Sequence, residues 1–374
     1  MFKKLLCLLS AFCLAFTVWS ANAESISVSA KTAVLMNSAT LSVYYNKNMH
    51  KKMPMASTTK IMTAVVLCEN AKLDQKVKIT DDMVLVEGSS MGLQKDDWIS
   101  YYGLLCGMLL ASGNDAANSV ALSLSGSIED FALLMNKKAD EIGMKDTNFV
   151  TPSGLDDEQH YSTAYDMALL AAYALKIPAI RDVVSQKSIV IEFGNPVHKQ
   201  RIKNHNRLLS IYSDAVGVKT GFTKKSGRCL VSAAERDNTT LIAVTLNAPD
   251  DWDDHCNLYD YGFSILSDYD ISELVKLDGI ALVGSRKQKV RPKVSKKIIK
   301  ATKDDIKKIT YKPYLPKYIY ATSCFDDVGR VDYYCNGNYL TTSAVTVEHN
   351  FDVKNKKLGV MARMFQNFFS LLRF

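Results

Sequence analysis

Strand-like and helical patterns follow one another along this chain in an order that restricts its fold. Short strand-like runs cover residues 32–36 and 41–45. Apolar residues at helical spacing dominate the stretch that follows. The expected helices cover residues 57–70, 102–110, 115–124, 129–142, 163–175 and 252–266, and later strands cover residues 215–221, 228–236 and 239–247, the last two joined by a turn at Asp237-Asn238. Because strands from both ends of this stretch can pair in one antiparallel sheet, the order predicts an α+β domain.

The N-terminus has the pattern of an export signal. Lys3 and Lys4 precede an apolar run at residues 5–19, and residues 21–23 (Ala-Asn-Ala) supply the small residues that signal peptidase recognises. Residues 1–23 are therefore predicted to be a cleaved signal peptide. The alternative is an uncleaved anchor, for which the apolar run is short. Loss of the two lysines lowers the net charge from +7 to +5 (7 minus 2).

Composition changes near residue 270. Residues 24–268 are predicted to form the α+β domain, and residues 269–346 a small β-rich domain with short alternating segments. Residues 286–312 contain twelve Lys or Arg and two acidic residues. Such a run is either a solvated face or, in an exported protein, a contact for anionic wall polymer or lipid headgroups. No nucleic-acid-binding motif accompanies it, so we do not expect a nucleic acid partner.

The last residues, 347–374, have the pattern of an amphipathic helix. Large apolar side chains share one helical stripe and polar side chains the other. The apolar stripe contains Leu358, Met361, Phe365, Phe368 and Leu372, and the polar stripe contains Arg363, Gln366, Asn367, Ser370 and Arg373. The segment is too polar to span a bilayer, and we expect it to lie at a membrane surface. A helix packed on its own protein is the alternative.

Six cysteines remain after the predicted signal peptide, and their spacing is neither a disulfide scaffold nor a zinc site. Cys68, Cys106 and Cys229 lie in apolar stretches and are expected to pack as small core residues. Cys324 and Cys335 are expected to flank a hairpin, and whether a disulfide joins them is left open. The histidines are dispersed, and no metal site is predicted.

The first motif that carries chemistry is S-x-x-K at Ser57 and Lys60. Residues three apart share one face of a helix, so the amine can reach the hydroxyl. A serine hydroxyl becomes a nucleophile when a base takes its proton, and a lysine is that base only when burial or a nearby cation lowers its pKa. The motif alone is also compatible with an ordinary helix start capped by a hydroxyl.

Two further motifs follow. Ser112-Gly113-Asn114 lies between two apolar helical stretches, and it is either a simple helix connection or a loop whose Ser112 relays a proton while Asn114 fixes a substrate peptide. Lys219-Thr220-Gly221-Phe222-Thr223 lies on an expected strand. There Lys219, Thr220 and Thr223 could hold a carboxylate, and Gly221 could leave room for a substrate backbone. The alternative is a polar strand end followed by a turn.

Together, S-x-x-K, S-x-N and K-T-G, spaced 55 and 107 residues apart, resemble the motif set of penicillin-binding proteins and serine β-lactamases. The stretches at residues 154–168, 204–209 and 227–231 are similar to those of the serine D-Ala-D-Ala carboxypeptidases, the low-mass penicillin-binding proteins of peptidase family S11. The resemblance is close over residues 30 to 265 and looser beyond. It implies a β-lactamase/transpeptidase-like domain, a small β-rich domain and an amphipathic tail.

The resemblance also implies a function. Ser57 would attack the peptide bond between two terminal D-alanines of a peptidoglycan stem peptide, with Lys60 as base, and β-lactams would acylate the same serine. The implied site contains Ser57, Lys60 and Ser112 as catalytic residues, the N–H groups of Ser57 and Phe222 as oxyanion hole, and Asn114, Lys219, Thr220, Gly221 and Thr223 as substrate-binding residues. No metal or organic cofactor is implied. The implied location is the cell-wall compartment, at the outer face of the cytoplasmic membrane.

Three alternatives stay in view. A class A β-lactamase would need an E-x-x-L-N acid, and residues 148–166 contain no match. A D,D-endopeptidase that cuts crosslinks usually lacks the C-terminal domain expected at residues 269–346. A wall-binding protein with a dead site would be expected to have lost part of the motif set, whereas all of it is present here.

Overall fold

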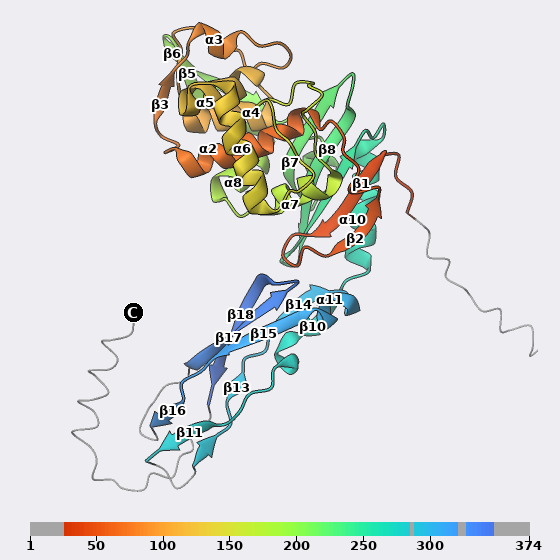
Figure 1. Ribbon diagram of the computed structural model, residues 1–374, viewed down its shortest axis with the longest axis vertical. Coiled ribbons are helices and arrows are strands. Elements are labelled where there is room, and N and C mark those ends of the chain that lie inside the picture. The colour runs from red at the N-terminus through yellow and green to blue at the C-terminus, as the bar shows by residue number, and fades with distance from the viewer. Residues whose placement is uncertain (1–25, 285–287, 321–326, 348–374) are drawn as a thin grey trace, which may run out of the picture.

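The computed structural model of the chain describes residues 26–284, 288–320 and 327–347 (Figure 1). The strands of its largest sheet are β1 (Thr32–Asn37), β2 (Val43–Lys47), β7 (Ala215–Thr223), β8 (Gly227–Arg236) and β9 (Thr239–Leu246). They are antiparallel and lie in the order β2-β1-β9-β8-β7. Pairing of β1 with β9 joins strands from both ends of the stretch, which confirms the predicted α+β class.

Both faces of this sheet are covered, because successive residues of a strand point to opposite sides. Val34 on β1 pairs with Val244 on β9, and both pack into the large core beneath the helices. Their neighbours Leu35 and Ala243 also pair, and they pack into a second core with helix α10 (Asp251–Ser264). All six residues of β1 are therefore buried.

A block of helices covers one face of the sheet, opposite α10 (Figure 1). Its members are α2 (Lys60–Asn70), α3 (Asp81–Val84), α4 (Tyr101–Leu110), α5 (Asn114–Ser125), α6 (Ile128–Ile142), α7 (Ala164–Ala174) and α8 (Pro178–Val184), and α9 (Leu208–Ile211) follows later. The main helices begin and end within two residues of their predicted bounds. The exception is the helix predicted over 57–70, which starts as a 3-10 turn, η1 (Ala56–Thr59).

The sequence analysis did not predict a second, four-stranded sheet beside the helices. It consists of β3 (Lys76–Lys78), β4 (Trp98–Ser100), β5 (Ser188–Gly194) and β6 (Val197–Lys203), in the order β3-β4-β5-β6. Only Ile202 is buried among the seven residues of β6, and β3 and β4 have three residues each. These three short or polar strands show no alternating apolar pattern by which the sequence could reveal them. Strand β5 does alternate, with Ile189, Ile191 and Phe193 toward the core, and the sequence analysis missed it.

The C-terminal region is rich in strands, as predicted, and has a small core of its own around Val331, Tyr333 and Val345. It contains β10 (Ser267–Asp270), η2 (Ile271–Leu274), β11 (Ile280–Val283), β12 (Lys289–Val290), β13 (Lys293–Val294), β14 (Ile298–Ala301), α11 (Lys303–Lys307), β15 (Ile309–Tyr314), β16 (Tyr318–Tyr320), β17 (Asp327–Cys335) and β18 (Asn338–Thr346). It meets the first region at the β1–β2 hairpin, where the Tyr44 hydroxyl donates to Asp305 Oδ2 at 2.8 Å (Figure 1). In the part of the chain that the structure describes, no helix combines the length and apolarity needed to cross a membrane.

The hairpin expected between Cys324 and Cys335 lies elsewhere. β17 continues as one strand through Gly329 to Cys335, and the chain reverses at Asn336-Gly337 before β18 begins. Both turn residues have positive φ, 51° and 81°, as a two-residue hairpin turn requires. Cys324 lies outside the described residues, as do the predicted signal peptide and the tail from residue 348 onward.

Candidate active site

Ser57 lies on the η1 turn, directly before α2. The turn starts from Ala56 at φ 48°, a left-handed conformation that costs an alanine roughly 1 kcal/mol or more. Gly154 packs against the turn so closely that a Cβ there would lie 2.0 Å from the Ala56 carbonyl oxygen. The surrounding chain therefore holds the Ser57 turn in a strained conformation, as is common at functional sites.

Lys60 is fully buried on α2, and its amine contacts three oxygen atoms. Its Nζ lies 2.9 Å from Ser57 Oγ, 2.7 Å from Asn114 Oδ1 and 2.7 Å from the carbonyl oxygen of Ser153. Burial lowers the pKa of the Lys60 ammonium well below its usual range, and the nearby charge of Lys219 lowers it further. The neutral amine is thus more easily formed than in an exposed lysine, directly beside the serine hydroxyl.

The partners of Lys60 also orient its lone pair. The Ser153 carbonyl can only accept a hydrogen bond, and so can Asn114 Oδ1, whose amide is oriented by Nδ2 donating to the Glu87 carbonyl at 2.7 Å. A neutral amine has two N–H donors, which these two acceptors satisfy. The lone pair is then left to accept the Ser57 hydroxyl proton.

The S-x-N loop lies where the sequence predicts, between the end of α4 and the start of α5. Ser112 has a left-handed backbone, φ 62°, and lines the cavity described below. Asn114 differs from expectation. Its side chain is buried beside Lys60 and is absent from the cavity lining, because its amide contacts Lys60 and Glu87. The Asn114 amide is therefore placed to orient the Lys60 amine.

Asp115, which the sequence analysis did not single out, fixes the wall of this loop. Its buried carboxylate accepts the backbone N–H groups of Met91, Gly92 and Leu93 at 3.0–3.1 Å, and the Ser90 hydroxyl at 2.5 Å. This cluster of donors holds the preceding loop against the N-terminus of α5. In the sequence, Asp115 is visible only as an acidic residue that follows the S-x-N motif. The groups that it binds become apparent only in the folded structure.

The K-T-G motif lies on β7, the edge strand nearest the helices. Lys219 is 1% exposed, its Nζ donates to the Thr220 carbonyl at 2.9 Å, and burial lowers the pKa of its ammonium to about 7. Thr223 Oγ1 lies 2.9 Å from Asp156 Oδ1, and Ser226 donates its backbone N–H to the same hydroxyl at 3.0 Å. Two of the three groups expected to hold a carboxylate are therefore engaged inside the protein.

Gly221 lines the cavity and also allows a close approach between two backbone segments. A Cβ at this position would lie 3.0 Å from the Met55 carbonyl oxygen, 3.1 Å from Ala56 Cβ and 3.1 Å from Ser57 N. The missing side chain lets β7 approach the backbone of the nucleophile turn. The glycine thus lets the K-T-G strand pack closely against the turn that carries Ser57.

One cavity of about 380 Å³ joins most of these residues. Its lining contains Ser57, Ser89, Ser112, His205, Arg207, Thr220, Gly221, Phe222, Arg228, Asp251 and Trp252. Lys60, Asn114 and Lys219 are buried, and Thr223 lies on β7 beyond Phe222; none of the four is part of this lining. Within residues 26–284, 288–320 and 327–347, no group of three or more His, Cys, Asp or Glu side chains is placed to hold a metal ion.

His160 is a supporting residue whose part the sequence did not reveal. Its Nδ1 accepts the Val150 N–H at 2.9 Å, so the ring proton resides on Nε2, which lies 2.8 Å from Thr59 Oγ1. Burial lowers the pKa of this imidazole to about 4, so it is neutral near pH 7. The ring thereby ties the loop that carries Ser153 to the η1 turn.

Comparison with known proteins adds a family. A sequence profile of peptidase family S11, D-alanyl-D-alanine carboxypeptidase, matches residues 18–250. D-alanyl-D-alanine carboxypeptidase DacF of Bacillus subtilis is 38% identical over 224 residues, which are 59% of this chain and 57% of that protein. The chain spans 57% to 64% of the length of three such curated relatives.

Two solved structures agree with the fold. The crystal structure of a Streptomyces DD-transpeptidase matches with a TM-score of 0.61 and 32% identity, covering 64% of this chain and 98% of its own. D-alanyl-D-alanine carboxypeptidase DacD from Francisella tularensis matches with a TM-score of 0.64 over 88% of this chain and 95% of its own, a likeness of fold alone at 24% identity. This chain belongs to the D-alanyl-D-alanine carboxypeptidase family, peptidase S11.

Proposed function

We propose that the chain is a serine D-Ala-D-Ala carboxypeptidase, which removes the terminal D-alanine from peptidoglycan stem peptides. The observation that carries the proposal is the buried Lys60 amine, 2.9 Å from Ser57 Oγ at the wall of the cavity. An amine of lowered pKa beside a serine hydroxyl is the arrangement that nucleophilic acyl transfer needs. Membership of the S11 family supports the choice of substrate.

In the first step, Ser57 Oγ attacks the carbonyl carbon of the penultimate D-alanine, and Lys60 takes the hydroxyl proton. The carbonyl oxygen gains negative charge, which the N–H groups of Ser57 and Phe222 stabilise as an oxyanion hole. The N-terminal end of α2 adds a favourable field, because the η1 turn that carries Ser57 leads directly into this helix. The proton then passes from Lys60 through Ser112 to the leaving nitrogen, and the peptide bond breaks.

In the second step, water attacks the ester that links the shortened peptide to Ser57. Lys60 again takes a proton, now from the water, and returns it to Ser57 Oγ as the ester bond breaks. The products are the shortened stem peptide and, from the first step, free D-alanine. The proposal involves no metal or organic cofactor.

Substrate recognition and inhibition use the same cavity. The sequence-based assignment gives the terminal carboxylate to Lys219, Thr220 and Thr223, with Gly221 and Asn114 near the peptide. Thr220 and Gly221 are the members of that set that line the cavity. β-Lactams, whose strained amide mimics the scissile bond, would acylate Ser57 and turn over slowly.

We also propose how the chain is organised and where it acts. Residues 1–23 are removed on export, 24–268 form the catalytic domain, 269–346 the β-rich domain, and 347–374 a helix on the outer face of the cytoplasmic membrane. Pairing of β10 with β14 supports a boundary near residue 268. Deletion of residues 355–374 should release the enzyme from membranes, and unchanged fractionation would contradict the tail's part. The mass of the mature N-terminus tests the cleavage.

The activity is tested with diacetyl-Lys-D-Ala-D-Ala and with labelled penicillin. The parent protein should release D-alanine and take up the label, whereas Ser57→Ala should do neither. Ser185→Ala is the matched control, because its hydroxyl bonds only the Asp182 carbonyl in the described structure. Labelling without release of D-alanine would overturn the carboxypeptidase assignment and favour cleavage of crosslinks, which crosslinked peptide dimers would then report.

A further inference from the structure

The cavity has two arginines on its wall that no motif assigns to the reaction. Arg207 directly precedes α9, and Arg228 lies on β8; both line the cavity with Ser57. Lys219, in contrast, is 1% exposed and donates to the backbone at Thr220. Cations that face the cavity are therefore guanidinium groups, which suit a planar carboxylate better than an ammonium does.

Arg228 occupies a defined place beside the K-T-G strand. It is directly opposite Phe222 in the β7–β8 register, while Thr220 is opposite Leu230. Thr220 and Arg228 are thus diagonal neighbours on one face of the sheet, about 7–8 Å apart, which is within reach of a long side chain. The guanidinium and the Thr220 hydroxyl can accordingly share one anionic group between them.

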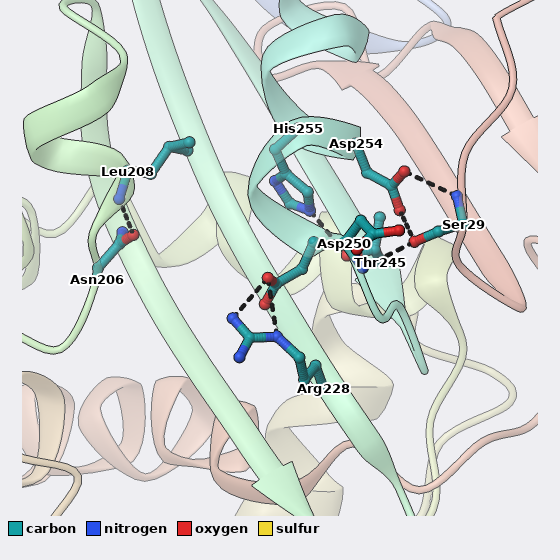
Figure 2. A network of polar contacts seen from close by, with 9 residues as sticks. Ser29, Asn206, Leu208, Arg228, Thr245, Asp250, Asp254 and His255 are labelled. Carbon is teal, nitrogen blue, oxygen red and sulfur yellow. Dashed lines mark hydrogen bonds and ion pairs between the residues drawn. The ribbon is translucent and has the colours of Figure 1, made fainter.

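The guanidinium is also held in position (Figure 2). Its Nε and Nη2 donate to Asp251 Oδ1 at 3.0 and 2.7 Å, and the group lies 5.5 Å from the centroid of the Trp252 ring. Of its five N–H donors, these two bonds use two, and the group is 42% exposed. Three donors are left for a ligand from the cavity, with little ordering of the side chain still to occur.

The support of Arg228 extends to the first turn of α10. Asp254 accepts the Ser29 N–H at 2.7 Å and its hydroxyl at 2.8 Å, and the Asp250 N–H donates to that hydroxyl at 3.0 Å (Figure 2). The turn that carries Asp251 is therefore fastened to the N-terminal segment before β1. These contacts make the cation a rigid part of the site.

We propose that Arg228 is a specificity-determining residue that binds the terminal carboxylate of the substrate peptide, with Thr220 as its partner. The inference rests on the proposed carboxypeptidase function. Asp251 neutralises one charge, and Arg207 keeps the cavity wall positive. A fork of N–H donors favours a peptide that ends in a free carboxylate over one whose end is blocked.

The test compares a peptide ending in D-Ala-D-Ala with the same peptide ending in D-Ala-D-Ala-amide. The parent should favour the acid in kcat/KM. Arg228→Gln should lose about 10- to 100-fold on the acid and little on the amide, since charge-assisted bonds are lost only there. Arg236→Gln is the matched control, because it is on the same strand and pairs with Asp214 instead. It should behave as the parent does.

Several results would overturn the inference. One is a parental protein with the same kcat/KM on the acid and on the amide. Another is an Arg228→Gln variant that loses the same factor in kcat/KM on both peptides. A third is a selective loss on the acid in Arg207→Gln and not in Arg228→Gln. Arg228→Lys keeps the charge without the fork, and it should show an intermediate loss if the glutamine variant does not fold. A parent that releases nothing from either peptide would refute the carboxypeptidase function itself, which separates the two failures.

Discussion

The region before residue 267 and the β-rich region after it both contain antiparallel strands, but they bury different groups. The first region buries two lysines, Lys60 and Lys219, together with Asp115 and two histidines, His160 and His255. The core of the second is almost wholly apolar, and Asp305, in a helix cap, is one of the few charged groups buried there. The second region therefore has the core of a structural scaffold, whereas the first region has the buried charges of a candidate active site.

Burying a charged group costs free energy unless partners compensate it. In the first region part of the compensation lies next to the cavity residues Ser57 and Ser112, where Lys60 meets three acceptors and Asp115 collects loop N–H groups. A protein that needed only stability could use apolar residues at such positions. Polar burial concentrated around a cavity therefore marks the part of the chain that performs chemistry.

The largest expected effect comes from removing the base. Lys60→Met should slow acylation by labelled penicillin about 10³-fold, because Ser57 then has no group to take its proton. Lys300→Met is the matched control in the second region, where Lys300 pairs with Asp268 at 3.2 Å, and it should label at the parental rate. Parental labelling by Lys60→Met, with unchanged thermal unfolding, would refute its role.

A pair of buried aspartates compares the regions directly. Asp115→Asn should lower the free energy of unfolding by about 3 kcal/mol and slow acylation about tenfold, because an amide group repels some of the loop N–H donors. Asp305→Asn weakens the bonds from Tyr44 and Thr302, because a neutral amide oxygen is a weaker acceptor than a carboxylate, and should destabilise by a similar amount while leaving acylation unchanged. Denaturant unfolding and acylation rates measure both. If both variants lost the same factor in acylation rate, the two regions would not differ in how their buried aspartates affect the site.

Acid should act on the first region through its buried histidines. Burial lowers the pKa of His160 to about 4 and that of His255 to about 3. The unfolded chain therefore binds more protons between about pH 3 and 6.5, and stability falls as the pH is lowered through that window. His255→Gln should reduce this slope of melting temperature against pH, whereas His198→Gln, at an exposed site, should not. Equal slopes in both variants would contradict the account.

The smallest effect concerns the contact between the regions. Tyr44→Phe removes the hydroxyl that donates to Asp305 and should cost about 1 kcal/mol of unfolding free energy. Acylation should be unchanged, because the contact lies at the β1–β2 hairpin and apart from the cavity residues. A melting curve and a labelling time course test both statements, with Tyr45→Phe as control. Slower labelling would show that the second region influences the site.

Much of the fold follows from the sequence because its main elements have strong patterns. The central strands β1 and β9 are short apolar runs bounded by turn residues, and most of the long helices have apolar residues at helical spacing. In the small sheet, β3 and β4 are only three residues long and β6 buries only Ile202, so these strands lack such a pattern. Strand β5 does have one, with Ile189, Ile191 and Phe193 at a period of 2, and the sequence analysis missed it. The turn at Asn336-Gly337 has the Asn-Gly sequence that favours a two-residue hairpin turn. The expectation of a hairpin between Cys324 and Cys335 overlooked this sequence and was wrong.

For the site, the motifs identified residues more reliably than they identified contacts. Ser57 and Lys60 are joined as their helical spacing predicts. The partners of Asn114 and the close packing of Gly221 depend on chain segments far away in sequence, which a local motif does not specify. Arg228 and Asp251 meet across 23 residues, so only the folded sheet and helix reveal that pair.

The most direct test of the account is to locate the covalent bond that penicillin forms. After reaction and digestion with trypsin, the added mass should be found on the peptide from Met53 to Lys60 and assigned by fragmentation to Ser57. Added mass on a peptide that contains Ser112, or on none, would contradict the claim that the amine of Lys60 activates this serine.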